Sequence, residues 1–151
     1  MSKHAYLILA HQQDYTLKTL IKLLDDKRND IFLHMDAKCS EYNLQELKKL
    51  ISYSTFCSIP RCIVNWGSFS MVEAELNLLK ASTTSHEKYD YYHLLSGEDL
   101  PLKSPSYIHK FFNENSGKEF VRFNHQIFKY QNRVNYYYIL QKKLNPRSYN
   151  I

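Results

Sequence analysis

Short apolar segments alternate along this chain with segments whose apolar residues recur at helical spacing. The first, HAYLILA at positions 4–10, shows no polar alternation, which is typical of a strand buried in a parallel sheet. Asp14 or Thr16 is placed to cap the helix that should follow. That helix is predicted from apolar residues at i, i+3, i+4 and i+7: Leu17, Leu20, Ile21 and Leu24.

The same alternation continues through the next two units. Residues 31–35 form a second apolar run, which ends at Asp36. Ser40 is expected to cap the helix after it, and a third strand is predicted within 55–64, interrupted by Pro60. The apolar residues of the predicted second helix are Leu44, Leu47, Leu50 and Ile51.

A capping-box pattern, Ser70-x-x-Glu73, predicts the start of a third helix. A fourth strand is expected within 89–95, and Pro105 after Ser104 is typical of a helix start. A further strand over 118–123 and a last helix over 131–144 complete the predicted order. The apolar side of the third helix is predicted to comprise Met71, Val72, Leu76 and Leu79.

Strands that alternate with helices predict a single α/β domain over residues 1–151, with a mostly parallel sheet and helices on both faces. The sequence has no internal repeat and no linker. Ligands of such sheets bind at the carboxyl ends of the strands. The residues expected there are His11, Asp36, Trp66 and the segment 96–99.

The composition excludes several other classes of protein. With 44% hydrophobic residues, 3 Gly and 4 Pro, the chain is neither disordered nor collagen-like. No apolar stretch approaches the ~20 residues of a membrane span, and no signal peptide is visible. Three cysteines, an odd number, argue against a disulfide framework. We therefore expect a cytoplasmic protein, with peripheral association with a membrane as the alternative.

The net charge of +5 suits an anionic partner, such as a nucleotide, a nucleic acid or a membrane surface. The basic residues are dispersed and no nucleic-acid-binding module is present, so we expect no nucleic-acid partner. Gly-x-Gly-x-x-Gly, P-loop and Gly-x-Ser-x-Gly motifs are all missing. No Asp-x-Asp pair occurs, so a diphosphate here should be neutralised by Lys or Arg rather than by a metal ion.

Four segments, in order and in register, carry a resemblance to a known family: 5–11, 34–38, 66–80 and 91–103. Together they resemble the branching β-1,6-N-acetylglucosaminyltransferases and the related peptide O-xylosyltransferases, the core-2/I-branching enzyme family. The similarity is strong over residues 4–103 and looser to about residue 140.

The resemblance implies a GT-A-like, Rossmann-type fold and an inverting, metal-independent glycosyltransferase. Such an enzyme moves N-acetylglucosamine or xylose from a UDP-sugar to an acceptor hydroxyl of a glycan. A carboxylate acts as general base, and basic side chains carry the diphosphate charge. No cofactor and no metal ion are expected.

The resemblance also assigns roles to individual residues. Asp36 should face the ribose of the donor, and His11 should lie near the uracil. Trp66 is expected to wall the donor pocket or to belong to the core. Asp99 should orient the sugar or its own loop, with Gly97 and Pro101 shaping the turn.

Glu119 and Arg133 are the residues that the resemblance places near the acceptor. The family's general base and its diphosphate-binding Lys and Arg lie further along than Ile151, so the catalytic base is unknown. We therefore expect the chain to correspond to the donor-binding, N-terminal half of a family domain. The face that the missing half would cover should then be exposed, and a second copy of the chain is an expected partner there. The alternative is a catalytically inactive nucleotide-sugar- or glycan-binding remnant.

Overall fold

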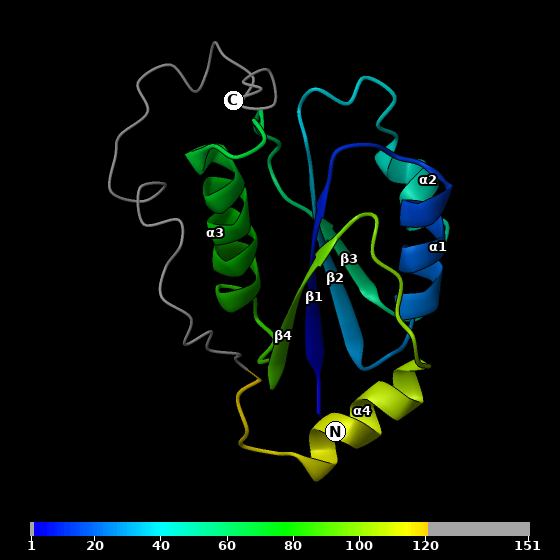
Figure 1. Ribbon diagram of the computed structural model, residues 1–151. Helices are drawn as coiled ribbons and strands as arrows, with labels where there is room; N and C mark the ends of the chain where they lie inside the picture. Colours follow the sequence, from blue (N-terminus) through cyan, green and yellow to red (C-terminus); the bar gives the residue numbers. More distant parts are fainter. Residues whose placement is uncertain (1, 121–151) are drawn as a thin grey trace, which may run out of the picture.

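The computed structural model describes residues 2–120 and contains four parallel strands flanked by helices (Figure 1). The strands lie in the order β3-β2-β1-β4, and every neighbouring pair is parallel. This arrangement confirms the predicted α/β class and is consistent with a GT-A-like fold. The elements in chain order are β1 (His4–Ala10), α1 (Tyr15–Leu24), β2 (Asn29–Met35), α2 (Leu44–Lys48), β3 (Thr55–Ser58), α3 (Phe69–Thr83), β4 (Tyr91–Ser96) and α4 (Pro105–Glu114).

The helices lie on both faces of the sheet, as the alternation predicts (Figure 1). Helices α1 and α2 cover one face, where the core cluster includes Ile8, Ile21, Leu33 and Leu47. Helix α3 covers the other face, where Leu78 packs with Ala5, Leu7 and Phe32. Because alternate residues of β1 and β2 point to opposite faces, the two strands contribute to both clusters. Helix α4 lies across the amino-terminal end of the sheet.

Helix α1 forms as the sequence predicts. The side chain of Asp14 accepts a hydrogen bond from the backbone N–H of Leu17 at 2.9 Å, so Asp14 rather than Thr16 is the N-cap. The four residues of the predicted apolar face are all fully buried: Leu17, Leu20, Ile21 and Leu24.

Helix α2 begins later than the prediction from Ser40. Its N-cap is Asn43, whose side chain accepts from the N–H of Glu46, and the helix spans only Leu44–Lys48. Leu47 is its one fully buried residue. The third strand is also shorter than predicted, because β3 ends at Ser58, just before Ile59 and Pro60.

Helix α3 does not use the predicted capping box. Its N-cap is Ser68, so Glu73 lies beyond the third helical position and cannot complete a box. The hydroxyl of Ser70 instead accepts a hydrogen bond from the N–H of Asn65 at 2.8 Å.

The buried face of α3 also differs from the predicted apolar side. Ala74, Leu78 and Ser82 are buried, whereas Val72, Leu76 and Leu79 are 43%, 53% and 39% exposed. The small side chains of Ala74 and Ser82 let the helix lie close to β1 and β2. The predicted larger apolar side chains are therefore turned away from the sheet.

The last two predicted elements fall mostly outside the described residues. Residues 118–120 are not part of a strand, and 121–123 and 131–144 lie beyond the described part of the chain, as does Arg133. Within residues 2–120, no helix is both long enough and apolar enough to cross a membrane.

Candidate functional site

The carboxyl ends of β1, β2 and β4 lie level with one another. The N–H of Asp36, just after β2, donates to the carbonyl of Ala10 at 2.8 Å, and the N–H of Gly97 donates to that of Leu9 at 2.7 Å. From β1 the chain continues to β2 on one side, whereas β4 lies on the other side. This reversal of strand order is the position at which open α/β sheets bind their ligands.

Asp36 is 4% exposed and ties two loops together. Its Oδ1 accepts from the N–H of Lys38 at 2.9 Å and from that of Val64 at 3.3 Å. Its Oδ2 lies 3.5 Å from the Nζ of Lys38, which is half exposed. The structure therefore places Asp36 at the predicted edge and gives its carboxylate a positioning role in the loops there.

Arg61 stabilises the same loop and was not singled out from the sequence. Its guanidinium donates to the backbone carbonyls of Met35, Asp36 and Cys39 at 3.3, 2.7 and 2.6 Å. The guanidinium also lies 5.0 Å from the ring centroid of Tyr42. No local pattern identifies such a residue, because its acceptors lie 22 to 26 positions earlier in the chain.

His34 and Cys62 form a second pair near this edge. The N–H of Cys62 donates to His34 Nε2 at 3.2 Å, and the Cys62 Sγ lies 3.3 Å from the same nitrogen. Burial lowers the pKa of His34, and burial raises the pKa of the Cys62 thiol. The thiol is therefore not activated as a nucleophile.

His11 and the loop after β4 meet at the reversal point. His11 Nε2 lies 3.5 Å from the Oε1 of Glu98, and both side chains are largely exposed. Asp99 Oδ2 accepts from the N–H of Ser96 at 2.7 Å, which closes the turn. The carboxylates of Glu98 and Asp99 thus have different partners, although the two residues are adjacent in sequence.

The remaining predicted site residues among those described are Trp66 and Glu119. Trp66 is 55% exposed and lies two residues before Ser68, the N-cap of α3, so it is not a core residue. Glu119 is exposed, after the end of α4. Among residues 2–120, no three His, Cys, Asp or Glu side chains are placed to hold a metal ion.

A cavity of about 240 Å³ lies beside the loop that carries Asp99. It is mostly apolar and is bounded by the sheet, the loop and α4. Its walls include Tyr6, His93, Asp99, Pro101, Ile108 and Phe112. Leu24 of α1 also lines this cavity, so α1, α4 and the loop between β4 and α4 all border it.

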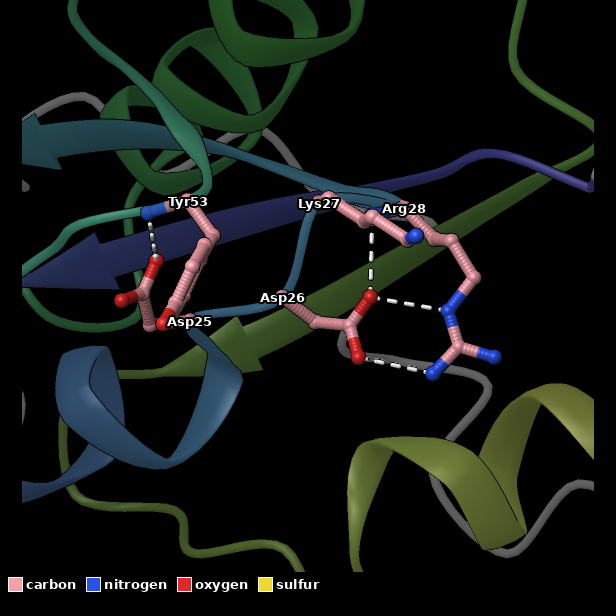
Figure 2. Close-up of a pocket in the computed structure, with 5 residues that line it drawn as sticks. All are labelled: Asp25, Asp26, Lys27, Arg28 and Tyr53. Atoms are coloured by element: carbon pink, nitrogen blue, oxygen red, sulfur yellow. Dashed lines mark hydrogen bonds and ion pairs between the residues drawn. The ribbon is translucent and has the colours of Figure 1, made fainter.

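A second cavity, of about 300 Å³, lies near the amino-terminal ends of the strands (Figure 2). Arg28 donates to both carboxylate oxygens of Asp26 at 2.8 and 2.7 Å, and Asp25 accepts from the N–H of Tyr53 at 2.9 Å. The Arg28 hydrogen bonds lower the pKa of Asp26 to about 2. The charges of Asp26 and Arg28 are paired with each other, and the Asp25 carboxylate accepts from backbone amides. No residue predicted for the donor site lies here.

Comparison with known proteins identifies relatives of this chain. The model of the Core-2/I-branching enzyme family matches residues 4–148. The human N-acetyllactosaminide β-1,6-N-acetylglucosaminyl-transferase is 26% identical over 116 residues, which are 76% of this chain and 29% of that protein. A β-1,3-galactosyl-O-glycosyl-glycoprotein β-1,6-N-acetylglucosaminyltransferase of bovine herpesvirus 4 is 24% identical over 146 residues, 95% of this chain and 33% of that protein.

A third relative, the mouse β-1,3-galactosyl-O-glycosyl-glycoprotein β-1,6-N-acetylglucosaminyltransferase 3, is 26% identical over 102 residues, 66% of this chain and 23% of that protein. The chain thus spans a third or less of the length of these curated relatives. The family model, in contrast, matches nearly the whole chain. The resemblance seen in the sequence is thereby confirmed, and the chain belongs to the Core-2/I-branching enzyme family.

Proposed function

We propose that this chain is the donor-binding part of a β-1,6-N-acetylglucosaminyltransferase that uses a UDP-sugar. The observation that carries the proposal is the meeting of three resemblance segments at one edge of the sheet. His11, Asp36 and the loop of Asp99 lie where the strand order reverses, and hydrogen bonds hold the three strand ends level. The similarity to named transferases supports the same activity.

The proposed donor contacts follow from the position of each side chain. Asp36 accepts from the ribose hydroxyls with Oδ2, which has only the half-exposed Lys38 Nζ at 3.5 Å beside it, because Oδ1 already accepts from two backbone amides. His11 is exposed enough to contact the uracil, and Trp66 offers an exposed aromatic wall. Asp99 holds the turn after β4 and thereby positions the loop beside the sugar.

On the acceptor side, the proposal includes Glu119 and Arg133, with a glycan hydroxyl as the nucleophile. N-acetylglucosamine is the favoured sugar because the relatives are N-acetylglucosaminyltransferases by name. Xylose is the alternative donor sugar. Transfer with inversion requires one direct displacement, assisted by a carboxylate base within about 2.6–3.2 Å of the hydroxyl.

Calorimetric titration tests the donor site directly. UDP is expected to bind more tightly than UMP or ADP. Asp36→Asn keeps an oxygen for the amides of Lys38 and Val64 but removes the carboxylate, and it should weaken UDP binding by roughly 1.5–3 kcal/mol. Glu114→Gln, an exposed change in α4, is the matched control. Equal UDP affinity of Asp36→Asn and the wild-type chain would contradict the proposed ribose contact.

We propose further that the donor binds without a metal ion. Asp99 faces the N–H of Ser96 while Glu98 faces His11, so the two carboxylates do not form a joint ligand. UDP affinity should therefore be the same with and without EDTA. A large loss on chelation that Mn²⁺ restores would refute metal independence.

The alternative function, nucleotide-sugar binding without transfer, is supported by the partners of the edge carboxylates. Asp36 and Asp99 accept from backbone amides and Glu98 faces His11, so each already has a partner in the protein. A transfer assay with UDP-N-acetylglucosamine or UDP-xylose and galactose- or serine-containing acceptors separates the two functions. Multiple turnovers by the chain would eliminate the binding-only function.

A further inference from the structure

Three histidines from three different elements meet near the amino-terminal ends of strands β1 and β4. His4 opens β1, His93 lies in β4 and His109 lies in α4. The ring centroids of His4 and His109 are 4.0 Å apart, and those of His4 and His93 are 5.0 Å apart. His4 and His109 are almost completely buried, at 0% and 1% exposed.

The hydrogen bonds of this histidine cluster suit neutral rings. His109 Nε2 lies 2.8 Å from the Oδ1 of Asn29, whose own amide nitrogen donates to Leu24, so His109 is the donor. His4 Nδ1 and His93 Nε2 are 3.1 Å apart, so one ring donates and the other accepts. His109 Nδ1 and His4 Nε2 are buried and have no hydrogen-bond partner among the described residues. A proton added to the cluster would therefore produce a buried charge without a new acceptor.

The surroundings of the cluster disfavour protonation as well. Tyr6 stacks on His93 at 4.6 Å, and the Phe112 ring lies edge-on to His4 and His93. Burial is the main cause that lowers the pKa of all three histidines, to about 3 for His4 and about 4 for His93. The charged and titratable groups that face the cluster are Asp26 and Arg28 before β2, Asp90 and Tyr91 around β4, and Tyr6 in β1.

We propose that the histidine cluster is an acid-released latch that holds α4 against the sheet. Three further contacts of α4 converge on the same place. Tyr91 donates to the carbonyl of Phe112 at 3.3 Å, Arg28 donates to the hydroxyl of Ser106 at 3.3 Å, and Phe112 packs on Tyr91 at 4.4 Å. When a histidine becomes charged, separating α4 from the sheet returns that histidine to water.

The latch also controls the loop that carries Asp99. That loop runs directly from β4 into α4, and Asp99, Ile108 and Phe112 line the same 240 Å³ cavity as Tyr6 and His93. Release of α4 removes one wall of this cavity and frees one end of the loop. Acid should therefore weaken UDP binding too, a consequence that rests on the proposed function, whereas the release of α4 does not.

The direction of the pH effect follows from the neutral buried rings. Because their pKa values in the folded protein lie below the ordinary 6.5, the latch is fully closed above about pH 6.5 and weakens as the pH falls. If one such histidine titrates, the fraction of molecules with α4 released should be about thirtyfold larger at about pH 5 than at neutral pH. Titration of His4 and His93 together would multiply the two effects.

Hydrogen exchange of the full chain, measured by mass spectrometry over a pH series and corrected for intrinsic exchange, tests the latch. Amides of α4 are expected to lose protection at least about thirtyfold at about pH 5, while those of α3 keep theirs. His109→Gln retains a donor for Asn29 and cannot titrate, so the α4 amides of this variant should lose less protection at acid pH than those of the wild-type chain. His86→Gln, which changes an exposed loop histidine, should behave as wild type. Unchanged α4 protection in the wild-type chain at acid pH would overturn the proposal.

Proton NMR titration of the wild-type histidines keeps the test independent of how the variants fold. His4 and His93 should remain neutral while α4 is protected, and they should titrate only as protection is lost. Ring signals that titrate near the ordinary value with α4 still protected would also overturn the latch. Failure of UDP to bind at neutral pH would instead refute the proposed function and leave the exchange result intact.

Discussion

Single residues fix the approach of β4 to β1 at the proposed donor edge. A Cβ added to Gly97 would lie 2.9 Å from the Cβ of Ala10 and 3.3 Å from its Cα. These contacts involve the backbone of the central strand, which cannot move without disturbing both of its neighbours. Gly97 is therefore needed for close approach, whereas Gly117, with φ of +78° and nothing within 4 Å, is suited to a turn.

Gly97→Ala is expected to destabilise the fold by about 1–3 kcal/mol, the usual cost of overpacking. Gly117→Ala meets no atoms but adopts a left-handed conformation, which costs roughly 1–2 kcal/mol. Urea unfolding measures both changes. Only Gly97→Ala should also reduce UDP affinity, because only Gly97 adjoins the proposed donor site. If the Gly97→Ala variant were as stable as the wild-type chain, the ends of β1 and β4 would be able to move apart at little cost.

Asp26 is expected to make folding stability sensitive to acid. Its pKa of about 2, lowered by Arg28, lies below the ordinary 3.8. Its contribution is therefore present above about pH 4 and lost as the pH falls toward 2, an effect of about 2 kcal/mol. Unfolding free energies measured over this range should fall less steeply for Asp26→Asn than for wild type or Glu114→Gln. Parallel curves for all three proteins would contradict this assignment.

At the scale of elements, the cap of a helix and the face it buries are set by different interactions. Helix α3 begins at Phe69 because the Ser68 side chain accepts from the N–H of Ser70 and its hydroxyl donates to the carbonyl of Asn65. Its buried face contains Ala74, Leu78 and Ser82 because these residues face β1 and β2. The Ser70 hydroxyl supports the start of the helix through Asn65 and Ser68, and not through a capping box with Glu73.

Ser68→Ala should therefore lower the free energy of unfolding by about 1 kcal/mol, the usual cost of losing a serine N-cap. Glu73→Ala, which removes the side-chain acceptor that a capping box requires, is the matched test of the capping-box prediction, and it should change stability by less than about 0.5 kcal/mol. Thermal or urea unfolding distinguishes the two variants. A larger loss of stability for Glu73→Ala than for Ser68→Ala would restore the capping box.

At the scale of the whole molecule, apolar side chains are exposed on the face of the sheet that α3 packs against. Tyr92 and Leu94 of β4, the last strand of the sheet among residues 2–120, are 41% and 49% exposed, and they pair with Ala5 and Leu7, which face α3. Leu76 on α3 itself is 53% exposed. Apolar surfaces of this kind are typical of contact sites.

The chain is expected to self-associate through this surface as its concentration rises. Charged side chains introduced by Leu76→Lys and Leu94→Lys should shift the equilibrium toward the monomer, because burying an unpaired charge is unfavourable. Leu102→Lys is the control, since Leu102 is 95% exposed in the loop between β4 and α4. Sedimentation velocity at several concentrations measures the effect. A monomer at every concentration would refute self-association through this surface.

The local sequence determined the order of strands and helices from β1 to α4 and the residues at the strand ends, but not where α2 and α3 begin or where β3 ends. Apolar runs, helical spacing and caps such as Asp14 and Ser104 act over a few residues, so they are legible in the sequence alone. Only the tertiary structure decided which face α3 buries, which oxygen of Asp36 is occupied and which side chains surround the loop of Asp99. The same is true of the histidine cluster, whose members are separated by up to 105 positions between His4 and His109. Such contacts depend on the order in which strands join the sheet, and no short-range pattern encodes that order.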